Sequence, residues 1–271
     1  MGGMPEIAVA VAQFAPGADV DANIEAIRDL TEAAVARGAQ LVVFPEYSSF
    51  FVDPVGAAFL DAAEPLDGPF TTALAAVADE VDVTVVAGLA ESGSTPGRFA
   101  NTVVAVQPGA GIVAAYRKQH LYDAFGAHES EWVEPGALDE PQLFDVGGVT
   151  IGLQTCYDLR FPEITRRIVD AGAELVLVPS EWVAGPLKDF HWRTLIAARA
   201  IENTVYVAAA DHVPPVGVGA SMIVDPMGVA LAELEDEPDI ALAHVSTEVL
   251  AQVRATNPSL KLRRYGVVPL Q

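Results

Sequence analysis

The chain has 271 residues, of which 51% are apolar, with a formal net charge of −22 and a single cysteine. This length allows one large domain or two small ones, and the apolar content supports a buried core without disulfides. The negative charge argues against nucleic acid or an anionic membrane surface as a partner, because both attract basic patches. No apolar run approaches the ~20 residues that span a bilayer, and no apolar leader opens the chain, so we expect a cytoplasmic protein.

Strands and helices alternate in the first half of the chain. Ile7–Phe14 and Leu41–Phe44 are nearly unbroken apolar runs, typical of strands buried on both faces. Between them apolar residues recur at the helical period, from a cap at Asp21 to an end at Gly38. The pattern then predicts one helix and three strands, at Ala73–Val81, Val83–Leu89, Thr102–Gln107 and Ile112–Tyr116.

The second half resembles the first. Val149–Leu153 is predicted as a strand and Pro162–Asp170 as a helix. Gly38–Pro45 (GAQLVVFP) and Gly172–Pro179 (GAELVLVP) share five of eight residues, and a glutamate follows each within two positions. Any strand entered from a helix that ends in glycine can look like this, but we favour a different explanation. The alternative is two similar α/β halves with their sheets face to face and helices outside.

No linker or low-complexity stretch separates the halves, so we expect a single domain over residues 1–271. The segment from residue 257 to 271 is interpreted as an extended C-terminal arm, expected at a subunit interface.

Cys156 stands between a predicted strand and a predicted helix, where ligand sites gather in α/β proteins. A sharp strand-to-helix turn exposes a side chain and points backbone N–H groups at it, and nearby positive charge favours the thiolate. Free cysteine is also among the most buried residue types, so an inert core cysteine remains the alternative.

Two further polar residues follow predicted strands. Glu46 stands at the strand edge that matches Cys156 in the other half, so the carboxylate and the thiol can meet if the halves pair. A partly buried glutamate has a raised pKa and is a useful base, although most strand-end glutamates are solvated. Lys118 can supply positive charge to an oxyanion or can simply be a solvated edge residue. No histidine pairs closely with Cys156 in the sequence.

Other types of site lack support. The chain has no C-x-x-C or H-x-x-x-H pair, so we expect no metal. Gly217–Ser221 lacks the third glycine of a dinucleotide loop, and no G-x-x-x-x-G-K occurs. We therefore expect no cofactor.

These positions resemble the nitrilase superfamily of carbon–nitrogen hydrolases, whose amidase branches use a Glu-Lys-Cys set. The resemblance covers nearly the whole chain, in order. Its motifs are LVVFPE (Leu41–Glu46), FANTVVAVQPG (Phe99–Gly109), YRKQHLYD (Tyr116–Asp123), CYDLRFPE (Cys156–Glu163), HWRTLIAARAIEN (His191–Asn203) and SMIVDPMG (Ser221–Gly228).

The resemblance implies a fold and a mechanism. The fold is a four-layer αββα sandwich, usually dimeric, so a homodimer is expected. Glu46 is implied as the base, Cys156 as the nucleophile that forms a thioester, and Lys118 with the backbone N–H of Tyr157 as the oxyanion site. A second family glutamate matches Glu129, which positions Lys118 and the substrate. Glu131 and Glu134 are expected to be solvated.

The residues after the cysteine indicate the branch. True nitrilases carry Trp-Glu there, whereas this chain has Tyr157-Asp158 and resembles omega-amidases and deaminated glutathione amidases. These release ammonia from amides of small carboxylic acids. Arg160 is the candidate contact for a substrate carboxylate, and a structural salt bridge to Asp or Glu is the equal alternative.

Further contacts and functions remain open. Tyr47, Trp182 and His128 are pocket candidates that can equally be packing residues. The stretch Glu181–Lys188 departs from the aromatic-and-small pattern of omega-amidases, so that substrate does not transfer directly. N-carbamoyl amino acid hydrolysis is an alternative activity, and a non-catalytic binding protein on the same scaffold is an alternative of another class.

Overall fold

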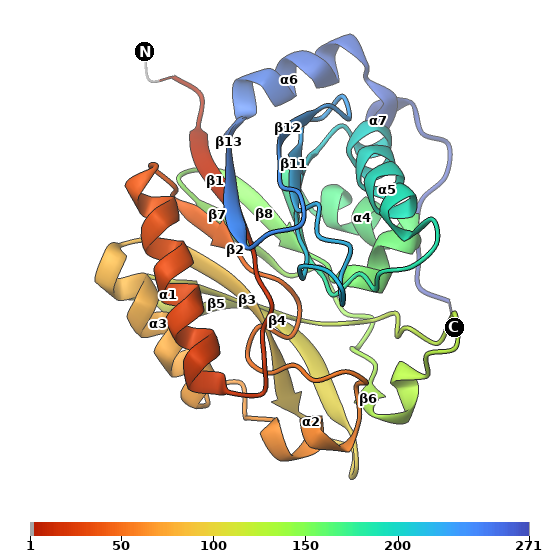
Figure 1. The fold of residues 1–271 in the computed structure, drawn as a ribbon. Coiled ribbons are helices and arrows are strands. Elements are labelled where there is room, and N and C mark those ends of the chain that lie inside the picture. Colours follow the sequence, from red (N-terminus) through yellow and green to blue (C-terminus); the bar gives the residue numbers. More distant parts are fainter. Residues whose placement is uncertain (1–2, 271) are drawn as a thin grey trace.

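A computed structural model describes residues 3–270, in which two β-sheets pack face to face between two pairs of helices (Figure 1). The predicted four-layer αββα sandwich is thereby confirmed. No helix in this part of the chain is long and apolar enough to cross a membrane.

The first sheet has seven strands in the order β13-β1-β2-β3-β4-β5, with β6 paired to β4. Strands β1, β2 and β3 are parallel, and β13 closes one edge antiparallel to β1. These strands are β1 (Glu6–Gln13), β2 (Leu41–Val43), β3 (Thr84–Ser92), β4 (Phe99–Gln107), β5 (Gly111–Arg117), β6 (Val133–Glu134) and β13 (Asp239–Ser246).

The second sheet has six strands in the order β12-β11-β10-β9-β8-β7, with β8, β9 and β10 parallel. These strands are β7 (Leu143–Val146), β8 (Val149–Leu153), β9 (Leu175–Pro179), β10 (Tyr206–Ala210), β11 (Met222–Val224) and β12 (Ala230–Glu233). The parallel strands are continuous apolar runs because each faces the other sheet on one side and helices on the other.

Helices cover both outer faces. Helices α1 and α3 lie on the first sheet, and α4 and α5 lie on the second (Figure 1). The helices are α1 (Val20–Ala36), α2 (Ala57–Ala62), α3 (Pro69–Val81), α4 (Pro162–Asp170), α5 (Lys188–Asn203), α6 (Thr247–Thr256) and α7 (Ser259–Leu262), with single 3₁₀ turns η1 (Glu129–Glu131) and η2 (Cys156–Arg160).

Two predicted helix starts were wrong. The cap of α1 is Asp19, whose side chain accepts a hydrogen bond from the Ala22 N–H, and Asp21 instead lies in the first turn. An aspartate two residues earlier satisfies the free N–H group equally well, so the pattern alone did not separate them. Helix α3 begins at Pro69 rather than Ala73, because proline suits the first helical position.

The internal repeat corresponds to two equivalent β-α-β units. Units β1-α1-β2 and β8-α4-β9 each end in a strand entered from a glycine with positive φ, Gly38 at 93° and Gly172 at 118°. In this repeat the counterpart of Glu46 is the Glu181 region after β9, whereas Cys156 follows the neighbouring strand β8. Glu46 and Cys156 still approach each other, because the carboxyl ends of parallel strands share one edge of each sheet.

The C-terminal arm is extended only in part. Its first residues form the short helix α7, which contacts α5, and Arg263 then binds Asp170 with nitrogen–oxygen distances of 2.9 and 2.5 Å. Beyond this ion pair the arm runs free of the two sheets (Figure 1). Gln271 lies outside the described residues.

Candidate active site

A cavity of about 680 Å³ opens where strands of both sheets end. Its lining includes Glu46 after β2, Lys118 after β5, Glu129 on η1 and Cys156 on η2. The structure therefore brings together all four residues predicted to be catalytic, from segments as much as 110 positions apart, Cys156 and Glu46 being the furthest separated.

Lys118 is the centre of a buried ionic cluster. Its Nζ lies 2.9 Å from Glu46 Oε1 and 3.0 Å from the carboxylate of Glu129, and all three side chains are buried. The amide of Asn101 donates to both carboxylates, at 2.6 Å and 3.1 Å. Burial alone would lower the pKa of Lys118, but the carboxylates of Glu129 and Glu46 outweigh it and hold that pKa well above its usual value. The ammonium is thus fixed and permanently charged.

The segment after β2 that carries Glu46 and Tyr47 is fixed by contacts with several other parts of the structure. Tyr47 has a positive φ of 57° and donates its hydroxyl to Glu129 Oε1 at 3.0 Å. Gly88 on β3 lies directly beneath, where an added Cβ would come within 2.5 Å of the Tyr47 nitrogen. Burial lowers the pKa of His212 to about 4, so the ring is neutral near pH 7 and its Nε2 lies 2.7 Å from the Glu46 carbonyl. These contacts fix where the Glu46 carboxylate can point.

Cys156 sits in a strained turn. Its φ of 45° is a left-handed conformation that non-glycine residues rarely adopt, and such strain concentrates at functional sites. The thiol is buried, and its Sγ lies 3.3 Å from the carbonyl oxygen of Glu181. The N–H of Glu181 donates to Glu46 Oε2 at 2.6 Å, so a single residue bridges the thiol and the carboxylate.

Burial raises the pKa of Cys156 well above its usual value, the negative charge of Glu46 adds to the effect, and Lys118 opposes it. The resting thiol is therefore protonated near neutral pH. A nucleophile in this state needs a base beside it.

Another buried carboxylate, that of Asp158, supports the turn that carries Cys156. Asp158 Oδ2 accepts a hydrogen bond from the Tyr116 hydroxyl at 2.7 Å. Its Oδ1 accepts the His120 N–H at 3.0 Å and lies 2.8 Å from the ring Nδ1 of the same histidine. Asp158 thus ties η2 to the end of β5 and to the segment that follows Lys118.

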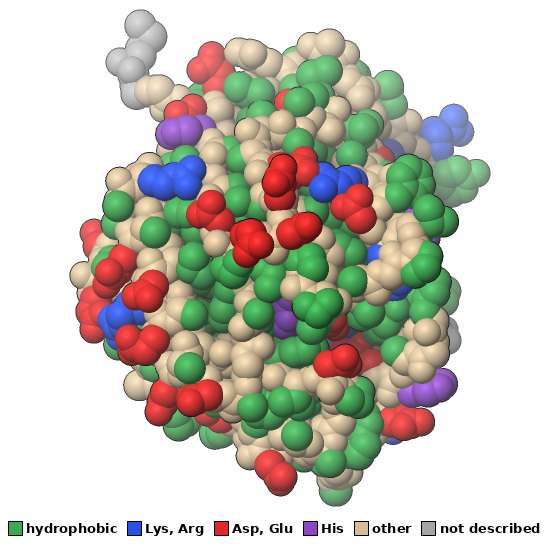
Figure 2. Space-filling view, in the orientation of Figure 1, with side chains coloured by type: hydrophobic (Ala, Val, Ile, Leu, Met, Phe, Trp, Pro, Cys, Tyr) green, Lys and Arg blue, Asp and Glu red, His purple; other side chains and the backbone are tan. Residues whose placement is uncertain are grey.

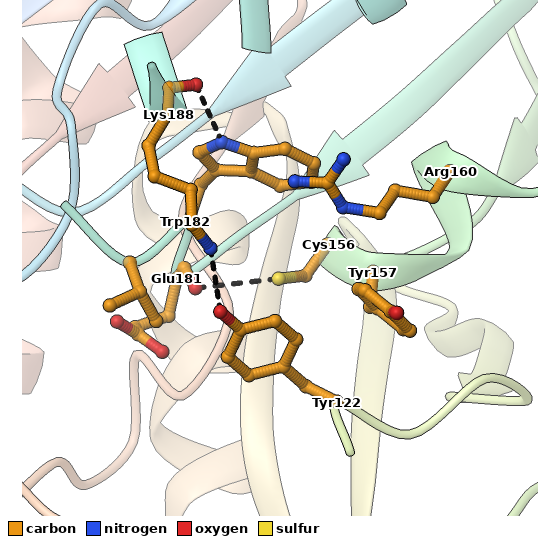
Figure 3. Close-up of a pocket in the computed structure, with 8 residues that line it drawn as sticks. Tyr122, Cys156, Tyr157, Arg160, Glu181, Trp182 and Lys188 are labelled. Atoms are coloured by element: carbon orange, nitrogen blue, oxygen red, sulfur yellow. Dashed lines mark hydrogen bonds between the residues drawn. The ribbon is translucent and has the colours of Figure 1, made fainter. Parts of the chain in front are cut away.

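A smaller pocket adjoins the thiol (Figure 3), and Lys118 is not among its lining residues. The Arg160 guanidinium lies 4.6 Å from the ring centroid of Trp182, and Trp182 donates its Nε1–H to the Lys188 carbonyl at 3.0 Å. Tyr157 and Tyr122 complete this side, with ring centroids 5.1 Å apart. The pocket therefore combines two cations with aromatic walls.

The other predicted contacts differ in their surroundings. Tyr47 and Trp182 are buried, so each both packs in a core and lines a cavity. His128 is exposed and lines the larger cavity. Glu131 is exposed, as expected.

The expectation that Glu134 is simply solvated was wrong. Its side chain is half-buried and accepts hydrogen bonds from the N–H groups of Ser94 and Thr95, both at 2.8 Å. It closes the loop between β3 and β4, a contact that sequence spacing does not reveal.

Several residues of the site were not predicted. Asn101 lies inside a family motif but carries no signal of its own, Asp158 was used only to indicate the branch, and Glu181 was noted only as part of the repeat. Lys188 was noted only as the end of a divergent stretch, and His212 was not singled out. Within residues 3–270, no group of three or more His, Cys, Asp or Glu side chains is arranged to hold a metal ion.

Comparison with known proteins identifies the class. The family model described as "Carbon-nitrogen hydrolase" matches residues 8–255, and the chain belongs to this family. The predicted family and the prediction of an enzyme that hydrolyses carbon–nitrogen bonds are therefore confirmed.

The chain is 40% identical over 258 residues to a deaminated glutathione amidase of Escherichia coli O157:H7, covering 95% of this chain and 97% of that protein. It is 41% identical over 222 residues to a Mycobacterium tuberculosis protein named as a hydrolase, covering 79% and 76% respectively.

Among solved structures, an amidase from Nesterenkonia sp. superposes with a TM-score of 0.77 at 28% identity, covering 94% of this chain and 96% of that one. Other structures of that amidase describe an active-site cysteine and a complex with butyramide.

Proposed function

We propose that this protein is an amidase that cleaves a small, carboxylate-bearing amide through a thioester on Cys156. The observation that carries the proposal is the single cavity that is lined both by Cys156 and by the Glu46–Lys118–Glu129 cluster. The relative named as a deaminated glutathione amidase and the solved amidase support the same reaction class.

In the first half-reaction, Cys156 Sγ bonds to the amide carbon while Glu46 accepts the thiol proton. The carbonyl π-electrons move onto oxygen, and Lys118 with the Tyr157 backbone N–H stabilises that oxyanion. The oxyanion then collapses, the carbon–nitrogen bond breaks, and Glu46 returns its proton to the departing nitrogen. The products are an acyl thioester and a free amine or ammonia.

In the second half-reaction, water attacks the thioester and Glu46 accepts its proton. The carbon–sulfur bond breaks, the acid leaves, and the sulfur regains a proton. Glu129 keeps Lys118 in place throughout, because its carboxylate bonds the ammonium directly and is itself held by Tyr47.

Arg160 supports an anionic substrate. Among residues 3–270, no Asp or Glu oxygen lies within 4.0 Å of its guanidinium, so the structural salt bridge considered as an alternative is absent. Its Nε–H is buried with no hydrogen-bond partner. A substrate carboxylate would satisfy a guanidinium with two parallel hydrogen bonds.

The test is an amide-hydrolysis screen with succinamate, glutaramate, deaminated glutathione and N-carbamoyl amino acids, with Cys156→Ala as the control. We expect acid and ammonia, or acid and amine, from the carboxylate-bearing amides. Cys156→Ala should lower the rate by at least about 10³-fold because the nucleophile is gone. Turnover of carbamoyl compounds alone, with release of carbon dioxide, would show the amidase proposal to be wrong.

We also propose a homodimer in which the C-terminal arm contacts the partner, and a cytoplasmic location. The dimer is supported by the exposed apolar side chains of the arm, with Tyr265 91% and Leu270 93% exposed. The location stays a prediction from the sequence.

A further inference from the structure

Two cations line the small pocket beside Cys156, Arg160 from η2 and Lys188 from the start of α5 (Figure 3). Lys188 is only 7% exposed, and its ammonium lies 4.1 Å from the ring centroid of Phe125. Their proximity is unfavourable, since burial and then the charge of Arg160 lower the pKa of Lys188.

Neither cation forms an ion pair with a carboxylate of the described residues. Among the described residues, no carboxylate oxygen lies within 4.0 Å of Lys188 or Arg160, although the sequence contains 37 acidic residues. The polar contacts of their charged groups are a hydroxyl and an imidazole: Lys188 Nζ donates to the Tyr122 hydroxyl at 2.6 Å, and Arg160 Nη2 lies 3.4 Å from His191 Nδ1. Two close cations with unused hydrogen-bond capacity form a site for an anion.

The position of this pair indicates which part of the substrate it meets. Glu46, which returns the proton to the leaving nitrogen, lines the large cavity and not the small pocket. Cys156 lines both. The leaving amine therefore belongs on the large-cavity side, and the acyl chain points toward Arg160 and Lys188.

The small pocket has a volume of about 10 Å³, room for roughly one water-sized group. A carboxylate oxygen fits this space and a long chain does not. The pocket therefore has room for one small end group of the acyl chain, and the two cations that line it favour an anionic group.

We propose that Lys188 completes, with Arg160, a two-cation subsite for the carboxylate of a short acyl chain, and thereby determines the specificity of the amidase. This inference rests on the proposed amidase function. The substrate class is the monoamides of short dicarboxylic acids, attacked at the amide end.

The test compares Lys188→Met, which removes the charge at similar length, with Lys188→Arg, which keeps it. Lys261→Met is the matched control, because it removes the same charge from an exposed residue of α7. Each variant is assayed with glutaramate and with its uncharged analogue valeramide.

Lys188→Met should lower kcat/KM for glutaramate by about 10- to 100-fold, mainly through KM, as expected for loss of a hydrogen bond to a charged group. Its activity on valeramide should change by less than about threefold, and Lys188→Arg and Lys261→Met should stay close to the wild type on both. An equal loss on both amides would assign Lys188 a purely structural role and overturn the proposal, as would no loss on glutaramate.

A binding measurement separates the subsite from turnover. In the Cys156→Ala background, calorimetry should show glutarate binding that Lys188→Met weakens by a similar factor. Unchanged glutarate affinity would contradict the subsite even if activity falls. Assays of the wild type distinguish the two proposals. Hydrolysis of valeramide as fast as glutaramate would overturn the subsite but leave the amidase function intact. No hydrolysis of any amide would overturn both the subsite and the amidase function.

Discussion

At the scale of single residues, burial and neighbouring charges set the protonation states of Lys118 and Cys156. Lys118 stays charged because Glu129 and Glu46 surround it, whereas Cys156 stays protonated because burial and Glu46 both disfavour the thiolate. The arrangement pairs a fixed cation for the oxyanion with a neutral nucleophile that needs a base during attack. It differs from catalytic cysteines whose pKa is lowered by a neighbouring cation, where the thiolate exists beforehand.

The reactivity of the thiol toward iodoacetamide tests this difference. The pKa of Cys156 is raised, so its alkylation rate should climb over a pH range higher than that of a free thiol, whose pKa is about 8.5. Intact-protein mass gives a clean count, because the chain has only one cysteine.

Cys156→Ala should take up no label, and N-acetylcysteine gives the reference profile. A midpoint below that of the reference would mean that a stabilised thiolate exists in the resting enzyme, contrary to our expectation.

At the scale of elements, close backbone contacts decide where the base stands. Strand β3 passes directly under the Glu46 loop, where the Gly88 N–H donates to the Pro45 carbonyl at 3.1 Å and its own carbonyl accepts the Ser49 N–H at 3.1 Å. Only a residue without a Cβ permits this approach. The turn η2 fixes the nucleophile through hydrogen bonds instead, because Asp158 Oδ2 accepts from the Tyr116 hydroxyl and from the Thr155 N–H.

Gly88→Ala should therefore damage both stability and activity. The added methyl group would press on the backbone of Glu46 and Tyr47, which cannot move aside as a flexible side chain can. We expect a loss of about 1–3 kcal/mol in the free energy of unfolding, measured by denaturant titration, and a fall in kcat of more than about tenfold.

Gly17→Ala is the matched control, because nothing lies within 4 Å of the added Cβ. It should change stability by less than about 0.5 kcal/mol. If Gly88→Ala behaved like this control, the close approach of β3 would not be what positions Glu46.

At the scale of the whole molecule, charge and surface set the conditions for binding. Acidic side chains are spread over the visible face and few basic ones interrupt them (Figure 2). The net charge of −22 repels an anionic substrate at long range, so a local cationic pocket must provide the attraction. The exposed apolar arm is the other whole-molecule feature, because such side chains gain from being covered.

Removal of residues 265–271 tests the arm. The intact chain should sediment as a dimer and the shortened chain mainly as a monomer, since Tyr265, Val268 and Leu270 are then missing. Replacement of Tyr265 and Leu270 by serine, which keeps the length, should weaken the dimer in the same direction. An intact chain that sediments as a monomer would refute the dimer, and a shortened chain that stays dimeric would place the interface elsewhere.

The sequence by itself determined most strands and helices up to β9, the family and the four catalytic candidates, because continuous apolar runs and motif spacing are local properties. It placed Val149–Leu153 and Pro162–Asp170 within their observed bounds. It did not determine that Arg160 lacks an acidic partner, that Lys188 lies beside it, or that Asn101 joins two carboxylates. Those facts depend on distances between segments that are remote in the sequence. Only tertiary packing decides which charged side chains are buried and which partners lie beside them.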